Sequence, residues 1–286
     1  MFGIFILFFC MDYAMEKASR SFFVKIEKHN IICILDNILQ MTTRGSGCSV
    51  SGKKYELSVY HIVTKCKLEG YDTYFNTQTE ENLGGCSSTN DIECTMDREN
   101  DIPIEIKKMQ TPDWMQCSLQ YNDTTKKWIG KSKHKIPEAS QKIFEELISN
   151  HILFHGKIPP FMTNDITHEE WKKIKSESDD FHDMYIDCPE DTIQKLYKEK
   201  GCVYIQISEK GLYHFGDDLC HFTVPKFVCE QQLRIRTKIH TTKDKKGYCK
   251  LSVTIACQPK NIKTIAKSPY SLDDKDKLPH NLLYMY

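Results

Sequence analysis

The sequence predicts an α/β fold with a mixed central sheet that helices flank. Apolar residues recur at helical spacing in residues 53–67 and 137–150, and polar and apolar residues alternate in residues 89–96 and 101–108. The last third of the chain, residues 203–257, is rich in strand-forming residues. With 286 residues, 40% of them hydrophobic, the chain can bury one large core or two small ones.

The N-terminal residues 1–45 are expected to be an extension ahead of the main domain. The first ten residues are apolar, but they are too few to cross a bilayer and lack the basic start of a signal peptide. We therefore expect no membrane association. Residues 42–54 are rich in small side chains and predict a loop, and Gly70 ends the helix that follows.

Residues 89–96 and 101–108 predict a β-hairpin joined by a polar turn. In a strand alternate side chains share a face, so Asp91 lies on the polar face of the first strand, and Glu105 and Lys107 lie on that of the second. A turn at the middle of the polar stretch would set Asp91 opposite Lys107. The sequence thus predicts carboxylates and a lysine side by side.

The remaining elements complete an expected α/β domain over residues 46–260. A Thr-Pro pair at residues 111–112 is typical of a helix start, and a capping box at residues 167–170 opens another helix. Residues 155–200 are expected to be a helical insertion. Residues 261–286 are polar and are expected to be a tail.

Cysteine usage and charge narrow the functional class. The 13 cysteines are odd in number and scattered without a CxxC pair, which is unlike a disulfide scaffold or a zinc site. We interpret them as reduced residues of an intracellular protein, without distinguishing nucleus from cytoplasm. The formal net charge is zero, so a nucleic-acid partner would have to bind a local basic face.

The polar face of the hairpin suits a divalent cation. Mg²⁺ prefers oxygen ligands, and one or two carboxylates with phosphate and water suffice. A lysine beside the ion can orient the attacking water and stabilise the charge that develops on the phosphate. The alternative is a solvated hairpin face with charge pairs, which antiparallel hairpins often carry. Pro103 and the flanking isoleucines favour a buried strand instead.

These residues resemble the PD-(D/E)XK nuclease superfamily, which includes restriction endonucleases, Holliday-junction resolvases and lambda-type exonucleases. The family has an aspartate on one hairpin strand and (D/E)-x-K on the next, here Asp91 and then Glu105 and Lys107. Many members also carry a glutamate on the preceding helix and a glutamine after the lysine, for which Glu56 and Gln116 are the candidates. Asparagine replaces the usual proline before the aspartate, and the spacing from the glutamine to the next tyrosine is one residue longer than usual.

The resemblance covers about residues 52–121 and implies a restriction-endonuclease-like fold and a metal-dependent DNA endonuclease of restriction, resolvase or repair type. Mg²⁺ is the implied cofactor, for which Mn²⁺ would substitute. The implied catalytic residues are Asp91, Glu105, Lys107 and Gln116, and the implied metal ligands are Glu56, Asp91 and Glu105. A lambda-type exonuclease and a catalytically inactive nucleic-acid-binding protein on the same fold are the alternatives.

A basic strand is the candidate DNA surface. In residues 233–240, Arg234, Arg236 and Lys238 alternate with other residues and share one face, and clustered cations suit contact with the phosphate backbone. A solvated strand face is the alternative. DNA is thus the expected partner, and a homodimer is left open.

A GxxxxGK match at residues 47–53 raises the alternative of a P-loop NTPase. Lys54 stands where such proteins have Ser or Thr to hold Mg²⁺, and no apolar strand precedes the motif. A loop that leads into a helix explains the glycines, so the nuclease interpretation is preferred.

Overall fold

The structure is a computed structural model that describes residues 44–80, 90–96, 101–110, 113–131, 136–243 and 249–286. The chain from Cys48 to Tyr286 forms one compact unit. Almost all of the expected extension at residues 1–45 therefore lies outside the described residues.

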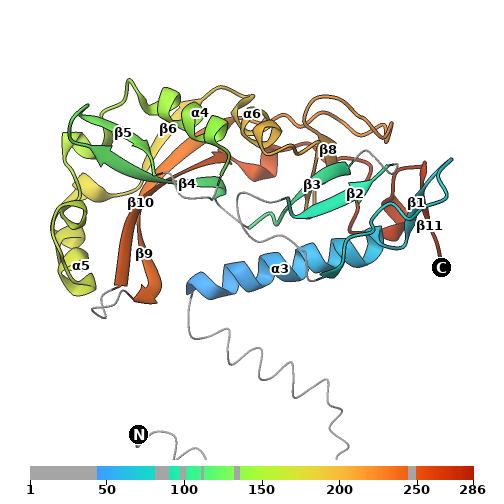
Figure 1. The fold of residues 1–286 in the computed structure, drawn as a ribbon, viewed down its shortest axis with the longest axis horizontal. Coiled ribbons are helices and arrows are strands. Elements are labelled where there is room, and N and C mark those ends of the chain that lie inside the picture. Colours follow the sequence, from blue (N-terminus) through green and yellow to red (C-terminus); the bar gives the residue numbers. More distant parts are fainter. Residues whose placement is uncertain (1–43, 81–89, 97–100, 111–112, 132–135, 244–248) are drawn as a thin grey trace, which may run out of the picture. The chain divides into compact units, whose positions relative to one another are not determined.

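A mixed four-stranded sheet carries the hairpin (Figure 1). Its strand order is β2-β3-β7-β8, with β2 at Ile92–Thr95, β3 at Asp101–Lys107, β7 at Tyr204–Ile207 and β8 at Gly211–His214. β3 pairs antiparallel with β2 and parallel with β7, and β7 pairs antiparallel with β8. The hairpin strand that carries Glu105 and Lys107 is therefore an inner strand with a neighbour on each side.

A second sheet of five strands has the order β5-β4-β10-β9-β6, and all its pairs are antiparallel. Its strands are β4 Trp114–Asn122, β5 Lys127–Gly130, β6 Met184–Cys188, β9 Gln231–Lys243 and β10 Cys249–Pro259. The α/β class is confirmed, but the strands are divided between two main sheets rather than gathered in one central sheet. The expectation of a helix that starts at residues 111–112 is wrong, because strand β4 begins at Trp114.

Four α-helices lie in the described segments: α3 Arg44–Val63, α4 Glu138–Ile148, α5 His168–Glu177 and α6 Thr192–Glu199. Short 3-10 helices lie at Leu153–Gly156, Pro160–Met162, Asp179–Phe181, Ile262–Thr264 and Lys275–Lys277. The capping box of α5 is confirmed, because the Thr167 hydroxyl accepts from the Glu170 N–H and the Glu170 carboxylate accepts from the Thr167 N–H. The insertion at residues 155–200 is not all helical, since it also contains β6.

The start of α3 corrects the expectation of a loop at residues 42–54. The helix begins at Arg44. Glycine and serine lower the helix propensity of this stretch, but they do not forbid a helix there. The GxxxxGK match at residues 47–53 consequently lies inside a helix, and its backbone does not form a phosphate-binding loop. The P-loop alternative is therefore set aside.

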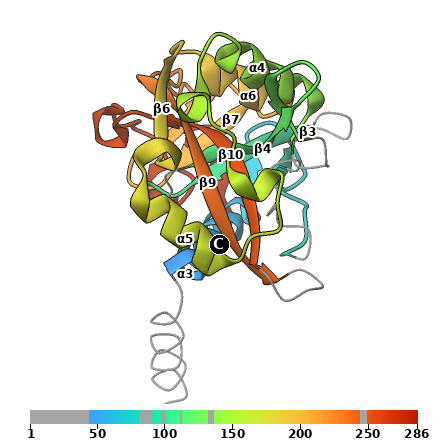
Figure 2. The ribbon, with the colours of Figure 1, turned by 90° about the vertical axis from the view of Figure 1, so that its left-hand side faces the viewer.

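Helices cover both faces of the mixed sheet. Val59 of α3 packs with Ile104 in one core, and Leu196 of α6 packs with Ile205 in the other. Side chains alternate along β3, so Glu105, next to Ile104, points toward the α6 side. α4 lies beside α6 (Figure 2), and apolar residues of both helices pack on the five-stranded sheet.

The C-terminal segment corrects the expectation of a polar tail at residues 261–286. β11 at Leu282–Tyr284 pairs antiparallel with β1 at Cys66–Leu68, and Leu272 is fully buried. A few apolar residues anchor this segment although its average composition is polar.

Two further features concern membranes and thiols. In the segments that the structure describes, no helix combines the length and apolar character needed to cross a membrane. Free thiols are present at Cys66, Cys94, Cys117, Cys188, Cys202, Cys220, Cys229 and Cys257, and all of these except Cys188 are buried.

Candidate active site

The hairpin register places Asp91 beside Glu105. Ile92 pairs with Ile104 in the β2–β3 ladder, and continuing this register by one residue sets Asp91 across from Glu105. The expectation of Asp91 opposite Lys107 is wrong by two residues, because alternation fixes the face of a side chain whereas the turn fixes the register. A two-residue shift leaves every side chain on its face, so the predicted grouping is retained.

Asp91 is held at the entrance of β2 by the backbone of β3. Its side chain is almost fully buried, and Oδ2 accepts a hydrogen bond of 2.8 Å from the N–H of Ile106. Burial, together with the nearby Glu105 carboxylate, raises the pKa of Asp91 to about 6. A cation that binds here would favour the ionised form of Asp91.

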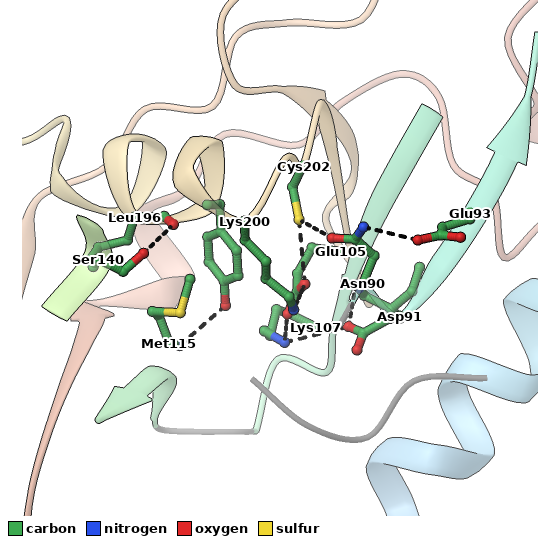
Figure 3. Close-up of polar contacts among 12 residues, drawn as sticks. Asn90, Asp91, Glu93, Glu105, Lys107, Met115, Ser140, Leu196, Lys200 and Cys202 are labelled. Carbon is green, nitrogen blue, oxygen red and sulfur yellow. Dashed lines mark hydrogen bonds and ion pairs between the residues drawn. The ribbon is translucent and has the colours of Figure 1, made fainter. Parts of the chain in front are cut away.

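Glu105 is buried between two lysines (Figure 3). Its Oε2 accepts from the ammonium of Lys200 at 2.6 Å, and its Oε1 contacts the ammonium of Lys107. Burial alone would raise the pKa of Glu105, but the two lysines lower it below its ordinary value. Glu105 is therefore a buried, ionised carboxylate, in contrast to Asp91.

Lys107 joins the two carboxylates. Its Nζ lies 3.5 Å from Asp91 Oδ2 and also contacts Glu105 Oε1. Burial would lower the pKa of Lys107, but Asp91 and Glu105 raise it well above its ordinary value. One cationic group thus reaches both carboxylates at once. A divalent cation that binds between Asp91 and Glu105 would have to take the place of this ammonium group.

The donor set is small for a complete metal site. Among the described residues, no group of three or more His, Cys, Asp and Glu side chains is close enough together to hold a metal ion. Mg²⁺ usually keeps several waters and takes one or two carboxylates together with substrate phosphate. Asp91 and Glu105 therefore fit a site that substrate and solvent complete.

Glu56 lies within electrostatic reach of this pair. It is one turn ahead of Val59 and two turns ahead of Val63, on the face of α3 that packs on the sheet. Burial first, and then the Asp91 carboxylate, raise the pKa of Glu56 to about 7, while Lys107 opposes this shift. The structure thus brings the predicted helical glutamate toward the site.

Replacing Glu56 with glutamine should make the protein more stable in alkaline but not in acidic solution. A carboxyl group with a raised folded-state pKa loses stability as pH rises from its unfolded pKa, 4.5, to its folded pKa of about 7. Above pH 7, Glu56→Gln should unfold at a higher urea concentration than wild type. Its free energy of unfolding should be larger by about 1–2 kcal/mol after allowing for solvent screening. At pH 4.5 the two curves should coincide.

Glu93→Gln is the control for this measurement, because the Glu93 side chain is exposed on the same hairpin. Its unfolding curve should follow wild type at each pH. If Mg²⁺ is held partly by Glu56, adding Mg²⁺ at pH 8 should stabilise wild type more than Glu56→Gln. Equal stability of Glu56→Gln and wild type at pH 8 would contradict the burial assigned to Glu56.

Three residues of the site were missed in the sequence: Lys200, Tyr197 and Cys202. The Cys202 thiol lies 3.7 Å from Glu105 Oε2. The Tyr197 ring lies 5.7 Å from the ammonium groups of both Lys107 and Lys200, and its hydroxyl accepts from the N–H of Met115 at 3.2 Å. The ring stacks on Phe215 with centroids 5.4 Å apart. The predicted end of a helix at Gly201 is the only local signal near them, and it indicates nothing about a site.

Gln116 is placed in β4, where it pairs with Ala256 of the five-stranded sheet. The described contacts of Asp91, Glu105 and Lys107 do not include it. Its neighbour Met115 reaches the site instead, through the backbone bond to Tyr197 described above. A supporting role for Gln116 stays a prediction.

The basic strand has acidic partners. Arg234 pairs with Asp183 at 2.6 Å and with Asp113 at 3.1 Å, and Arg236 also contacts Asp113. Both arginine side chains are largely covered. The charges of both arginines are compensated inside the protein. Lys238 lies opposite Ser252 in the β9–β10 ladder. DNA binding by this strand stays a prediction.

Comparisons with family models, with curated proteins and with solved structures give no match for this chain. The fold and the site together define a mixed α/β protein with a buried cluster of two carboxylates and two lysines. The assignment of function depends on the chemistry of this cluster.

Proposed function

We propose that this protein is a metal-dependent DNA nuclease that resembles the PD-(D/E)XK superfamily. The observation that carries the proposal is the single ammonium group of Lys107 in contact with both Asp91 and Glu105. Charged side chains on a buried strand are costly unless they are paired or functional. Perturbed carboxylates gathered around one lysine are typical of catalytic sites.

The mixed β2-β3-β7-β8 sheet supports the finer, restriction-endonuclease-like interpretation of the fold. It contains the antiparallel hairpin with the aspartate and the E-x-K strand, and helices α3 and α6 cover its two faces. The five-stranded sheet would then be an addition: β4, β5 and β6 enter the chain between β3 and β7, and β9 and β10 follow β8.

In this mechanism Asp91 and Glu105 would hold Mg²⁺ together with substrate phosphate and water, and Lys107 would act on the substrate. A ligand role for Glu56 stays a prediction. When bound, Mg²⁺ lowers the pKa of its water and offsets charge on the phosphate. The ammonium of Lys107, released from the two carboxylates, orients the attacking water and stabilises the developing negative charge. Glu105, already ionised, keeps its ligand oxygen available at neutral pH.

Incubation of the purified protein with supercoiled, linear and branched DNA, in Mg²⁺ or in EDTA, tests this function. Nicked or linear products from supercoiled DNA in Mg²⁺ alone are expected for an endonuclease. Degradation only from linear ends would indicate the lambda-type exonuclease. Binding without cleavage of any of the three substrates, or equal cleavage in EDTA, would contradict the proposal.

A further inference from the structure

Lys200 is a buried cation that belongs to the site but to none of the motifs in the sequence. Its side chain is 2% exposed, and its Nζ lies 2.6 Å from Glu105 Oε2. Burying an ammonium group is costly unless the group is paired with good geometry. The position of Lys200 is therefore bound to that of Glu105.

The backbone fixes Lys200 on both sides. It caps the C-terminus of α6, and Gly201 follows in the left-handed region at φ +84°, where glycine is preferred. The chain then enters β7, in which Ile205 pairs with Glu105 itself. The lysine and the carboxylate are thus carried by neighbouring, rigid elements.

The two lysines divide the oxygens of Glu105. Lys107 takes Oε1, the oxygen on the side shared with Asp91, and Lys200 takes Oε2. Lys107 is 16% exposed and has a second partner in Asp91, whereas Lys200 is almost completely enclosed. Of the two ammonium groups, the one at Oε1 is the one able to move aside.

Tyr197 lies close to both lysine ammonium groups. Its ring is within cation–π distance of both ammonium groups, at 5.7 Å each. Stacking on Phe215 and the hydrogen bond from Met115 prevent the ring from turning away. The ring would therefore keep Lys200 in place when Lys107 moves.

We propose that Lys200 is a positioning residue for Glu105: it holds Oε2, so that the carboxylate presents only Oε1 toward Asp91 and a divalent cation. This inference rests on the proposed nuclease function. Lys200 touches neither substrate nor metal in this role. It fixes the orientation of one ligand oxygen, and a misplacement of about 1 Å in such a group costs on the order of 10²-fold in rate.

Lys200→Met and Lys200→Arg test the proposal, with Lys198→Met as the control from the exposed side of the same helix. Three quantities are measured: the cleavage rate at saturating Mg²⁺ per folded protein, the binding of Mn²⁺ from the paramagnetic signal of the free ion, and the melting temperature. Lys200→Gln, which keeps a hydrogen-bond donor, replaces the methionine variant if the latter does not fold.

Lys200→Met is expected to bind Mn²⁺ at least as tightly as wild type, because a positive charge near the ion is lost. Its rate at saturating metal should nevertheless fall by about 10²-fold. Lys200→Arg should recover most of the rate, since a guanidinium also donates to a carboxylate, and Lys198→Met should equal wild type.

Two outcomes would overturn the inference while leaving the proposed function intact. One is a Lys200→Met protein with the wild-type rate. The other is a parallel loss of Mn²⁺ binding and rate, which would show that Lys200 only maintains the structure. A wild-type protein that cuts no DNA in Mg²⁺ would overturn both the proposed function and this inference.

Discussion

Lys107→Ala should stop DNA hydrolysis while leaving divalent-ion binding intact or tighter. The ammonium contacts Asp91 and Glu105 where the cation must bind, so its removal frees both carboxylates. The group that orients water and stabilises the phosphate is lost, which typically costs on the order of 10²–10³ in rate. Asp91→Ala should also be inactive, but in that variant Mn²⁺ binding should fall together with cleavage.

Lys108→Ala is the matched control. The Lys108 ammonium contacts the hydroxyl of Ser51 on α3 and not the two carboxylates. Cleavage by this variant should therefore equal wild type. If Lys108→Ala were as inactive as Lys107→Ala, or if Lys107→Ala lost its metal, the roles assigned to these neighbours would be wrong.

Glu105→Gln should be the most destabilising single change at the site. It removes the one carboxylate that both lysines share, and it leaves Lys200 buried without its anionic partner. Breaking a buried ion pair by removing one partner costs on the order of 3–5 kcal/mol. Urea unfolding at pH 7 should show this loss, and Lys200→Met added to Glu105→Gln should recover part of it.

The effect of Glu105→Gln should depend on pH. The pKa of Glu105 is lowered in the folded protein, so its stabilisation is present above its unfolded pKa and disappears as pH falls through the folded value. The difference from wild type should therefore narrow in acid. Glu138→Gln is the control, because it breaks an ion pair on the surface of α4. Its unfolding midpoint in urea should equal that of wild type. Equal stability of Glu105→Gln and wild type at pH 7 would contradict the buried pairing.

The hairpin and its polar cluster could be predicted because both depend on local alternation. Ile104 and Ile106 mark the apolar face of β3, and Glu105 between them must then face the other way. The helical stripe of Val59 and Val63 likewise places Glu56 on the packed side of α3. These are period-two and period-3.6 patterns, which a single sequence contains.

The rest of the site depends on pairing between distant segments. Lys200 reaches Glu105, and Tyr197 reaches the two lysines, because β7 runs parallel to β3, and no local pattern specifies that neighbour. The ladder register also escaped prediction, since a two-residue slip keeps every face unchanged. Gln116 was expected at the site from a motif, but it lies on β4, which belongs to the five-stranded sheet.

The most direct test of the central claim is a crystal structure of the wild-type protein with Mn²⁺, read from the anomalous signal of the ion. One ion is expected at about 2.1 Å from Asp91 and from Glu105 Oε1, with Lys107 displaced from between them and Lys200 still on Oε2. Lys107 still bridging the two carboxylates in saturating Mn²⁺, with no ion beside them, would contradict the claim.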